Sequence, residues 1–129
     1  MEVLLSQEVT QSFSALKQGL SNSNTDGFLI GHKRGSMFFI EKIFPSQKGF
    51  FPSYRDYFEI KKTLEDKILG FYSFQVTESK LKKILAPMAY GKIFLRFDRD
   101  KKAQWVIKSF VIEHDKDFFM QPINMKSVR

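Results

Sequence analysis

Short runs of aromatic and β-branched residues recur along the chain, and they constrain its fold more than any other feature. Each run is bounded by glycine, proline or charged residues, a pattern typical of strands that end in turns. A last run, residues 118–124, is expected to be an edge strand because Pro122 has no N–H to donate to a ladder. The other expected strands are residues 27–31, 36–45, 68–74, 92–98 and 103–113.

Three segments between these runs are expected to be helices. The first begins near Ser6, where apolar residues recur every three or four positions and form one stripe. The second is expected over residues 54–66, after a proline-bracketed loop. The third is short and begins after Thr77, whose hydroxyl can cap it.

Together these elements predict one α/β domain over residues 1–129, with a mixed β-sheet and flanking helices. Residues 32–35 and 98–102 are expected to be hairpin turns, and Gly35 can take a positive φ there. The 15 phenylalanines predict a core rich in aromatic rings. We expect residues 124–129 to be a disordered tail.

Composition excludes several classes of site. The chain has no cysteine, which excludes disulfides, thiolate metal sites and cysteine nucleophiles. The first residues lack the basic start and long apolar stretch of a secretory signal. No run approaches the roughly 18 apolar residues that a membrane-spanning helix needs. We therefore expect a cytoplasmic protein that does not contact a membrane.

The net charge of +7 lies entirely in the second half of the chain. Residues 1–60 carry equal numbers of basic and acidic side chains, whereas residues 61–129 carry 15 basic and eight acidic ones. A basic half can attract nucleic acid or an acidic partner, although solvated lysines are also common on proteins that bind neither. The residues that would carry nucleic-acid binding, here called the basic set, are Lys80, Lys82, Lys83, Lys92, Arg96, Arg99, Lys101 and Lys102.

Whether the basic set can bind single-stranded nucleic acid depends on the exposure of Phe94. Strand alternation puts it on one face with Lys92 and Arg96, as in platforms that stack the bases of single-stranded nucleic acid. The alternative is that Phe94 is buried against a helix and the cations are only solvated. A separate aromatic group, Phe50, Phe51 and Tyr54, is a candidate surface for a protein partner, because aromatic residues anchor many interfaces.

Two motifs resemble the JAMM (MPN) domain family. GFLIG, residues 27–31, is similar to the glycine-bounded first strand of the family, and GFYSFQ, residues 70–75, is similar to the aromatic start of its second motif. The order of the surrounding elements also resembles that family. The resemblance implies a JAMM/MPN (cytidine-deaminase-like) architecture, whose active members are zinc-dependent isopeptidases and metalloproteases.

The chemical groups of that family are missing at the matching positions. Its catalytic glutamate falls on Asn24, and an amide cannot take a proton from water. Its two histidine ligands fall on Ser73 and Gln75, which are poor zinc ligands beside imidazole. Its serine and aspartate fall on Thr77 and Lys80, and an ammonium group repels a metal ion. We call these five positions the predicted cleft.

The resemblance therefore implies a pseudoenzyme with no cofactor, acting as a scaffold or protein-interaction module. It also implies a partner, either another MPN-like domain or a second copy of the chain. Three alternatives stay open: the motifs are strands of an unrelated α/β fold, the basic set binds nucleic acid, or dispersed residues form an unrecognised hydrolase site. A small ligand in the predicted cleft is not excluded either.

Overall fold

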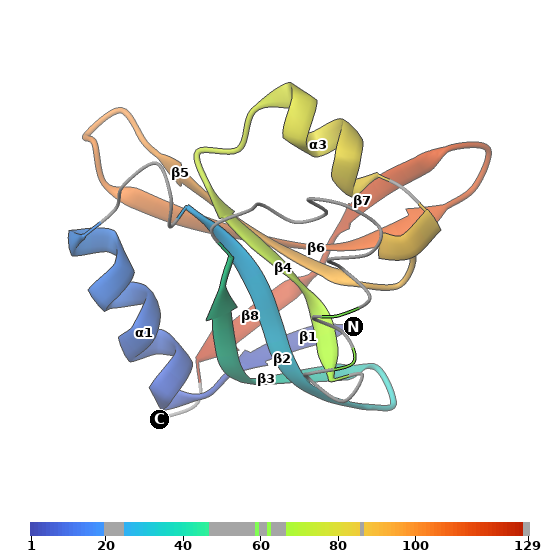
Figure 1. Ribbon diagram of the computed structural model, residues 1–129, viewed down its shortest axis with the longest axis horizontal. Coiled ribbons are helices and arrows are strands. Elements are labelled where there is room, and N and C mark those ends of the chain that lie inside the picture. Colours follow the sequence, from blue (N-terminus) through green and yellow to red (C-terminus); the bar gives the residue numbers. More distant parts are fainter. Residues whose placement is uncertain (20–24, 47–58, 60–61, 63–66, 86, 128–129) are drawn as a thin grey trace.

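The computed structural model describes residues 1–19, 25–46, 59, 62, 67–85 and 87–127 (Figure 1). The strands are β1 (Glu2–Leu5), β2 (Asp26–Arg34), β3 (Met37–Pro45), β4 (Ile68–Phe74), β5 (Ile93–Arg99), β6 (Trp105–His114), β7 (Phe118–Pro122) and β8 (Asn124–Ser127). The helices are α1 (Gln7–Gln18), α3 (Glu78–Ile84) and the 3-10 turn η1 (Pro87–Ala89).

The strands form one mixed sheet in the order β7-β6-β5-β4-β2-β3-β1-β8. Three pairs are parallel, β1 with β3, β1 with β8, and β4 with β5, and the other pairs are antiparallel. The sheet curls strongly into a half-barrel (Figure 1). Its two outermost strands, β7 and β8, follow each other in the chain with only Ile123 between them.

Both faces of the sheet are covered, as the side chains of β4 show. Tyr72 and Phe74 point to one face, where they join the core cluster of Val9 and Phe13 from α1. Phe71 points to the opposite face and joins the cluster that contains Ile84 of α3. A strand covered on both faces is apolar nearly throughout, as the sequence of β4 is.

Several predictions from the sequence are confirmed. The helix from Ser6 is α1, and the Ser6 hydroxyl accepts a hydrogen bond from the N–H of Val9 at its start. The predicted hairpin is formed by β2 and β3, although the strands extend further than expected and leave the turn at Gly35, whose φ is 57°. The short third helix is α3, capped by Thr77.

Two strands were not expected. β1 pairs in parallel with β3 and buries Val3 and Leu5 in the core. Residues 124–127 form β8, so the expectation of a disordered tail is wrong for them, and residues 128–129 lie outside the described part. The reason is pairing with β1, which supplies β8 with a backbone ladder that its own polar sequence does not indicate.

The fold class needs one correction. The described elements are mostly strands with two short helices, α1 and α3, so the described part of the chain is mostly β rather than α/β. The mixed sheet with flanking helices is as predicted. The helix expected over residues 54–66 falls outside the described residues apart from Glu59 and Lys62, which are helical.

Candidate functional site

Asp26, the first residue of β2, is a buried carboxylate that receives two side-chain donors. Its Oδ1 accepts a hydrogen bond of 2.6 Å from the Ser73 hydroxyl near the end of β4. Its Oδ2 lies 2.7 Å from the ammonium Nζ of Lys80 in α3. The side chain of Asp26 is 5% exposed and that of Lys80 is 36% exposed. We call these three residues the Asp26 cluster.

Local structure explains how three distant residues meet. In the antiparallel register of β2 and β4, Asp26 lies directly opposite Ser73. The chain then leaves β4 at Gln75, which has a left-handed φ of 56°. Thr77 begins α3, because its hydroxyl accepts a hydrogen bond of 3.3 Å from the N–H of Lys80. This cap fixes the first turn of α3 so that Lys80 reaches the carboxylate.

Within the Asp26 cluster, the negative charge of the carboxylate is compensated by a cation and a hydrogen-bond donor. An unpaired carboxylate in a protein interior is strongly unfavourable, whereas one that has a cation and a hydrogen-bond donor is tolerated. Lys80 supplies the cation, and Ser73 supplies the donor. The Ser73 residue is 0% exposed and its hydroxyl proton points to the carboxylate, so a substrate has no access to it as a nucleophile.

Two of the five predicted cleft residues meet in this cluster. Ser73 and Lys80 share Asp26, whereas Gln75 and Thr77 are exposed. Asn24 lies outside the described residues, and so do Phe50, Phe51 and Tyr54 of the predicted protein-contact surface.

Sequence reasoning overlooked Asp26. It closes the polar run of residues 21–26, and the family resemblance directed attention to Asn24 instead. The available signal was a single carboxylate placed directly before a buried strand. Such a group must find a partner, and Ser73, at the end of the other buried strand, was a candidate.

Tyr72 is a second buried polar group close to the cluster. Its hydroxyl has no hydrogen-bond partner among the residues that the structure describes. Its ring lies over Gly27, where an added Cβ would come within 2.5 Å of the ring and the hydroxyl. Burial, and then the negative charge of Asp26, raise the pKa of the Tyr72 hydroxyl above its usual value.

The basic set is divided by the fold. Lys80 belongs to the cluster described above. The Lys92 ammonium donates a hydrogen bond of 2.7 Å to the carbonyl oxygen of Ile68. Arg96 forms an ion pair in which its Nε lies 2.7 Å from Oδ2 of Asp98. These three cations therefore serve contacts within the protein.

The remaining described members of the basic set lie in two places. Lys82 is exposed on α3, and Lys101 and Lys102 are exposed at the turn between β5 and β6. Arg99, the last residue of β5, is exposed beside that turn and lies over the Trp105 ring. The side chain of Lys83 is outside the described part. A strand rises about 3.3 Å per residue, so the two ends of β5 lie roughly 20 Å apart and separate Lys92 from that turn.

Of the two interpretations of Phe94, burial against a helix is confirmed and a base-stacking platform on β5 is wrong. The expectation that its basic neighbours are only solvated is wrong for Lys92 and Arg96. Phe94 is 0% exposed and packs in the cluster that contains Ile84 of α3. A ring must present a free face to stack on a base. Phe94 therefore stabilises the junction of the sheet with α3 and is not accessible to nucleic acid.

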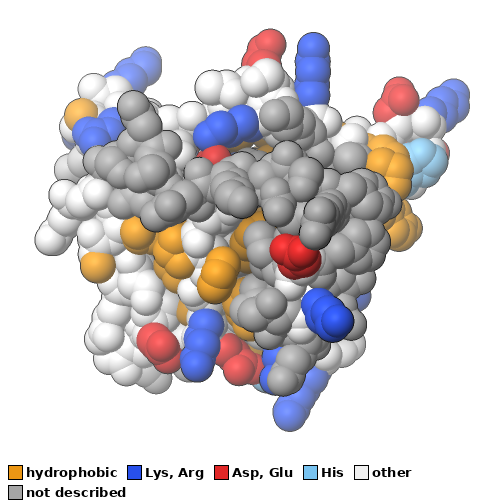
Figure 2. Space-filling model, viewed as in Figure 1, with side chains coloured by type: hydrophobic (Ala, Val, Ile, Leu, Met, Phe, Trp, Pro, Cys, Tyr) orange, Lys and Arg blue, Asp and Glu red, His pale blue; other side chains and the backbone are white. Residues whose placement is uncertain are grey.

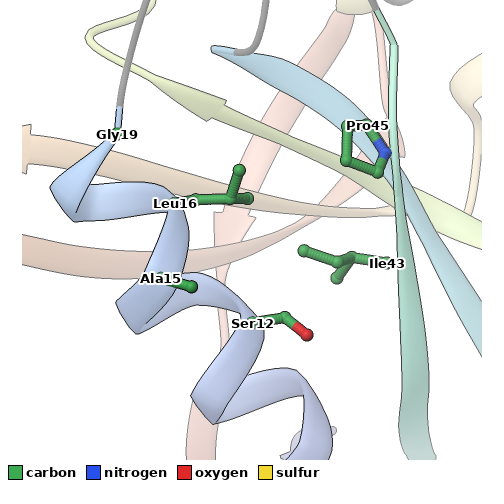
Figure 3. Close-up of a pocket in the computed structure, with 6 residues that line it drawn as sticks. All are labelled: Ser12, Ala15, Leu16, Gly19, Ile43 and Pro45. Carbon is green, nitrogen blue, oxygen red and sulfur yellow. The ribbon is translucent and has the colours of Figure 1, made fainter.

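A mostly apolar pocket of about 370 Å³ lies between α1 and the end of β3. Figure 3 shows Leu16 of α1 and Ile43 and Pro45 of β3 facing the space between the two elements. Ser12 contributes the one side-chain hydroxyl in this lining. The pocket lies on the α1 face of the sheet, whereas the Asp26 cluster lies on the α3 face.

Two features are absent from the part of the chain that the structure describes. Among them, no three His, Cys, Asp or Glu side chains are close enough to hold one metal ion. No helix in that part of the chain has the length and apolar character required to cross a membrane.

Comparison with known proteins gives a structural likeness. No protein-family model matches the chain, and no curated protein matches its sequence. It is similar to the solution structure of protein DSY2949 from Desulfitobacterium hafniense, solved by the Northeast Structural Genomics Consortium, with a TM-score of 0.70. The match covers 98% of this chain and 92% of that one at 15% sequence identity. At this identity the likeness shows the fold alone: the chain shares the curled, mostly β architecture of DSY2949.

Proposed function

We propose that the chain is a non-catalytic JAMM/MPN-like domain that acts as a scaffold or protein-interaction module. The observation that carries the proposal is the ion pair between Lys80 and Asp26. The resemblance assigns two positions of a zinc site to Ser73 and Lys80, and both of these side chains are bound to one buried carboxylate.

The physical argument concerns competition for that carboxylate. Zinc binding at Asp26 would require the Lys80 ammonium to leave its partner while remaining beside a divalent cation. That arrangement adds repulsion between two cations and removes the hydrogen bond of Lys80. The ammonium group therefore satisfies the carboxylate in place of a metal, and the site keeps its geometry without hydrolytic chemistry.

The order of elements gives further support. The described elements include a helix, a two-stranded hairpin, a buried strand and a capped short helix, in the order on which the resemblance rests. The helix that the resemblance puts between the hairpin and the buried strand lies outside the described residues, apart from Glu59 and Lys62. The strand-to-helix junction presents Ser73 and Lys80 from neighbouring elements, which is the arrangement expected of a former active site. The proposed partner is another MPN-like domain or a second copy of the chain.

Zinc binding and hydrolysis test the proposal that the domain is non-catalytic. Calorimetric titration of the wild-type protein with zinc should show no stoichiometric binding, and an isopeptide-linked substrate should remain uncleaved. Zinc bound at one equivalent, together with loss of that binding in Asp26→Asn, would contradict it. The substitution Lys80→Gln provides a matched control, because it removes the competing cation and leaves Asp26 in place.

Self-association and binding to other domains test the proposed role as a scaffold or protein-interaction module. Light scattering over a wide concentration range measures whether the chain pairs with itself. A reversible dimer supports the scaffold role directly. A monomer at every concentration leaves a different MPN-like domain as the proposed partner, and failure to bind any such domain would contradict this role.

A further inference from the structure

Three ring-bearing side chains and a proline line a cleft at the β6–β7 hairpin. The cleft has a volume of about 390 Å³, and its lining consists of Pro87, Tyr90, His114 and Phe118. Figure 2 shows hydrophobic side chains beside a histidine at the right edge of the molecule, with acidic and basic side chains further out. A volume of this size lies within the range of small-molecule sites in proteins.

The rings stand at steep angles to one another. The Tyr90 and Phe118 ring centroids are 6.5 Å apart with an interplanar angle of 71°. The His114 and Phe118 ring centroids are 4.6 Å apart with an angle of 55°. Tyr90 is 56% exposed, which is unusual for a large aromatic residue and leaves its ring accessible to a ligand. Rings that meet at such angles present faces and edges to one shared space.

The charge near the cleft is opposite to that of the whole chain. Residues 113–117, EHDKD, contain three acidic side chains and one lysine in a protein of net charge +7. Asp115 and Asp117 are exposed in the turn between His114 and Phe118. The local field therefore favours a cation and disfavours an anion.

The lining restricts the kind of cation. An ammonium group that carries N–H bonds needs several acceptors when it leaves water, and the described lining side chains offer only the Tyr90 hydroxyl and a ring nitrogen of His114, with no carboxylate. A quaternary ammonium group has no N–H to satisfy and is attracted to ring faces by the cation–π interaction. We propose that this cleft binds a quaternary ammonium group on a ligand with no adjacent anion, such as choline or a trimethylated lysine side chain. This site is separate from the proposed scaffold role and does not depend on it.

Paired ligands test the charge requirement. Choline and 3,3-dimethylbutan-1-ol have the same shape, but only choline is charged. In titrations of the ¹⁵N-labelled protein, choline should shift the amide signals of Tyr90, His114 and Phe118. It should bind about 3- to 30-fold more tightly than the neutral alcohol, the range expected for a cation–π contribution. Phosphocholine should bind more weakly than choline, because its phosphate meets the acidic turn.

Paired variants test the residues. Tyr90→Leu should abolish the preference for choline over the alcohol, whereas Tyr90→Phe, which keeps the ring, should retain it. Asp115→Asn combined with Asp117→Asn should weaken choline binding at least about twofold and leave the alcohol unchanged. All three substituted positions are exposed, so folding can be checked from the same spectra.

The results that would overturn the proposal are specific. Equal affinity for choline and the neutral alcohol would mean a merely apolar cleft. Shifts confined to other parts of the chain, or a preference that survives Tyr90→Leu, would also overturn it. If choline binds as expected, a parallel titration with an N-acetylated trimethyl-lysine amide shows which carrier is preferred.

Discussion

At the scale of single residues, the Asp26 cluster links the sequence to the proposed loss of chemistry. A carboxylate at the start of a buried strand is stable only because Ser73 and Lys80 reach it from other elements. The same two partners occupy its oxygens and so leave little capacity for a metal. The stability of the cluster and the proposed lack of hydrolytic activity would thus have one physical cause.

Replacing Lys80 by methionine should destabilise the fold. The substitution keeps much of the apolar stem but leaves the Asp26 carboxylate without its cation. Breaking a fully buried pair costs about 3–5 kcal/mol, and the partial exposure of Lys80 reduces the expected loss to about 1–3 kcal/mol. Urea unfolding measures the change.

The double variant Asp26→Asn with Lys80→Met is the control for that experiment. Because the amide needs no cation, the double variant should be more stable than Lys80→Met alone. Equal destabilisation in both would show that Lys80 contributes through packing alone, and the electrostatic account of the cluster would then be wrong.

Tyr72 predicts a dependence on alkaline pH. Its pKa is raised in the folded protein by burial and by Asp26, while an unfolded tyrosine ionises near pH 10. Below about pH 10 both states keep the proton, so this group causes no change in stability. Above it only the unfolded state releases the proton, so folding should weaken by up to about 1.4 kcal/mol per pH unit.

Tyr72→Phe isolates that effect. The variant removes a buried hydroxyl that has no partner among the described residues, so at neutral pH it should be as stable as wild type or up to about 1 kcal/mol more stable. The difference in unfolding free energy between variant and wild type should grow from pH 9.5 to pH 11. A constant difference over this range would mean that Tyr72 ionises normally in the folded state.

At the scale of elements, the sequence predicted what depends on neighbours in the chain. α1, the β2–β3 hairpin, β4 and the capped α3 all carry local signals: a stripe, a turn glycine, an apolar run and a threonine cap. β1 and β8 were missed because their signals are not local. Neither short segment forms a sheet alone, and each depends on pairing with a strand far away in the sequence.

The candidate site shows the same difference between local and long-range signals. Ser73 and Lys80 could be singled out from a motif, but Asp26 could not, because Ser73 is 47 residues away from it and only strand register brings them together. The sequence left two interpretations of Phe94 open for a related reason. Alternation correctly put Phe94 on one face with its basic neighbours, but the sequence does not say that α3 covers this face.

Removal of β8 should expose the β1 edge of the sheet. A chain ending at Ile123 loses the parallel ladder to β1 and the packing of Met125 against the core. We expect a lower urea midpoint and concentration-dependent association, because an unpaired strand edge is a template for pairing. Urea unfolding and light scattering measure the two effects.

A chain ending at Ser127 is the matched control, because it removes residues 128–129 and keeps β8. This control should behave as the full chain does. If the chain ending at Ile123 also matched the full chain in midpoint and mass, β8 would contribute nothing to the fold.

At the scale of the whole molecule, the excess of positive charge is spread over separate surfaces. Lys82 lies on α3, and Lys101 and Lys102 lie at the turn between β5 and β6. Phe94 is buried and cannot assist them, so nucleic-acid binding through the basic set stays a prediction that rests mainly on charge.

Replacing Lys82, Lys101 and Lys102 by glutamine tests whether the basic set binds nucleic acid. Any binding to a single-stranded oligonucleotide should weaken steeply with salt, because counterions are released on binding. The triple variant should reduce the slope of log K against log salt by roughly 2 if all three contact phosphates. Fluorescence anisotropy at several salt concentrations measures the slope.

A second triple variant, Lys33→Gln, Arg34→Gln and Lys42→Gln, changes the net charge by the same amount in the β2–β3 hairpin. It should leave the slope unchanged. Equal losses in the two triple variants would mean that net charge alone attracts the oligonucleotide, and the basic set would not be a binding surface.

The pairing of β1 with β8 also has a consequence for synthesis on the ribosome. Among the described strands, β1 comes earliest in the chain, and it lies between β3 and β8, which comes latest. Its second neighbour exists only once residues 124–127 have been translated and have left the exit tunnel. Until then the nascent chain exposes a strand edge beside a core that is otherwise ready to close. The sheet can therefore be completed only after residues 124–127 have been translated. A ribosome that pauses just before these residues holds the domain at its most association-prone stage.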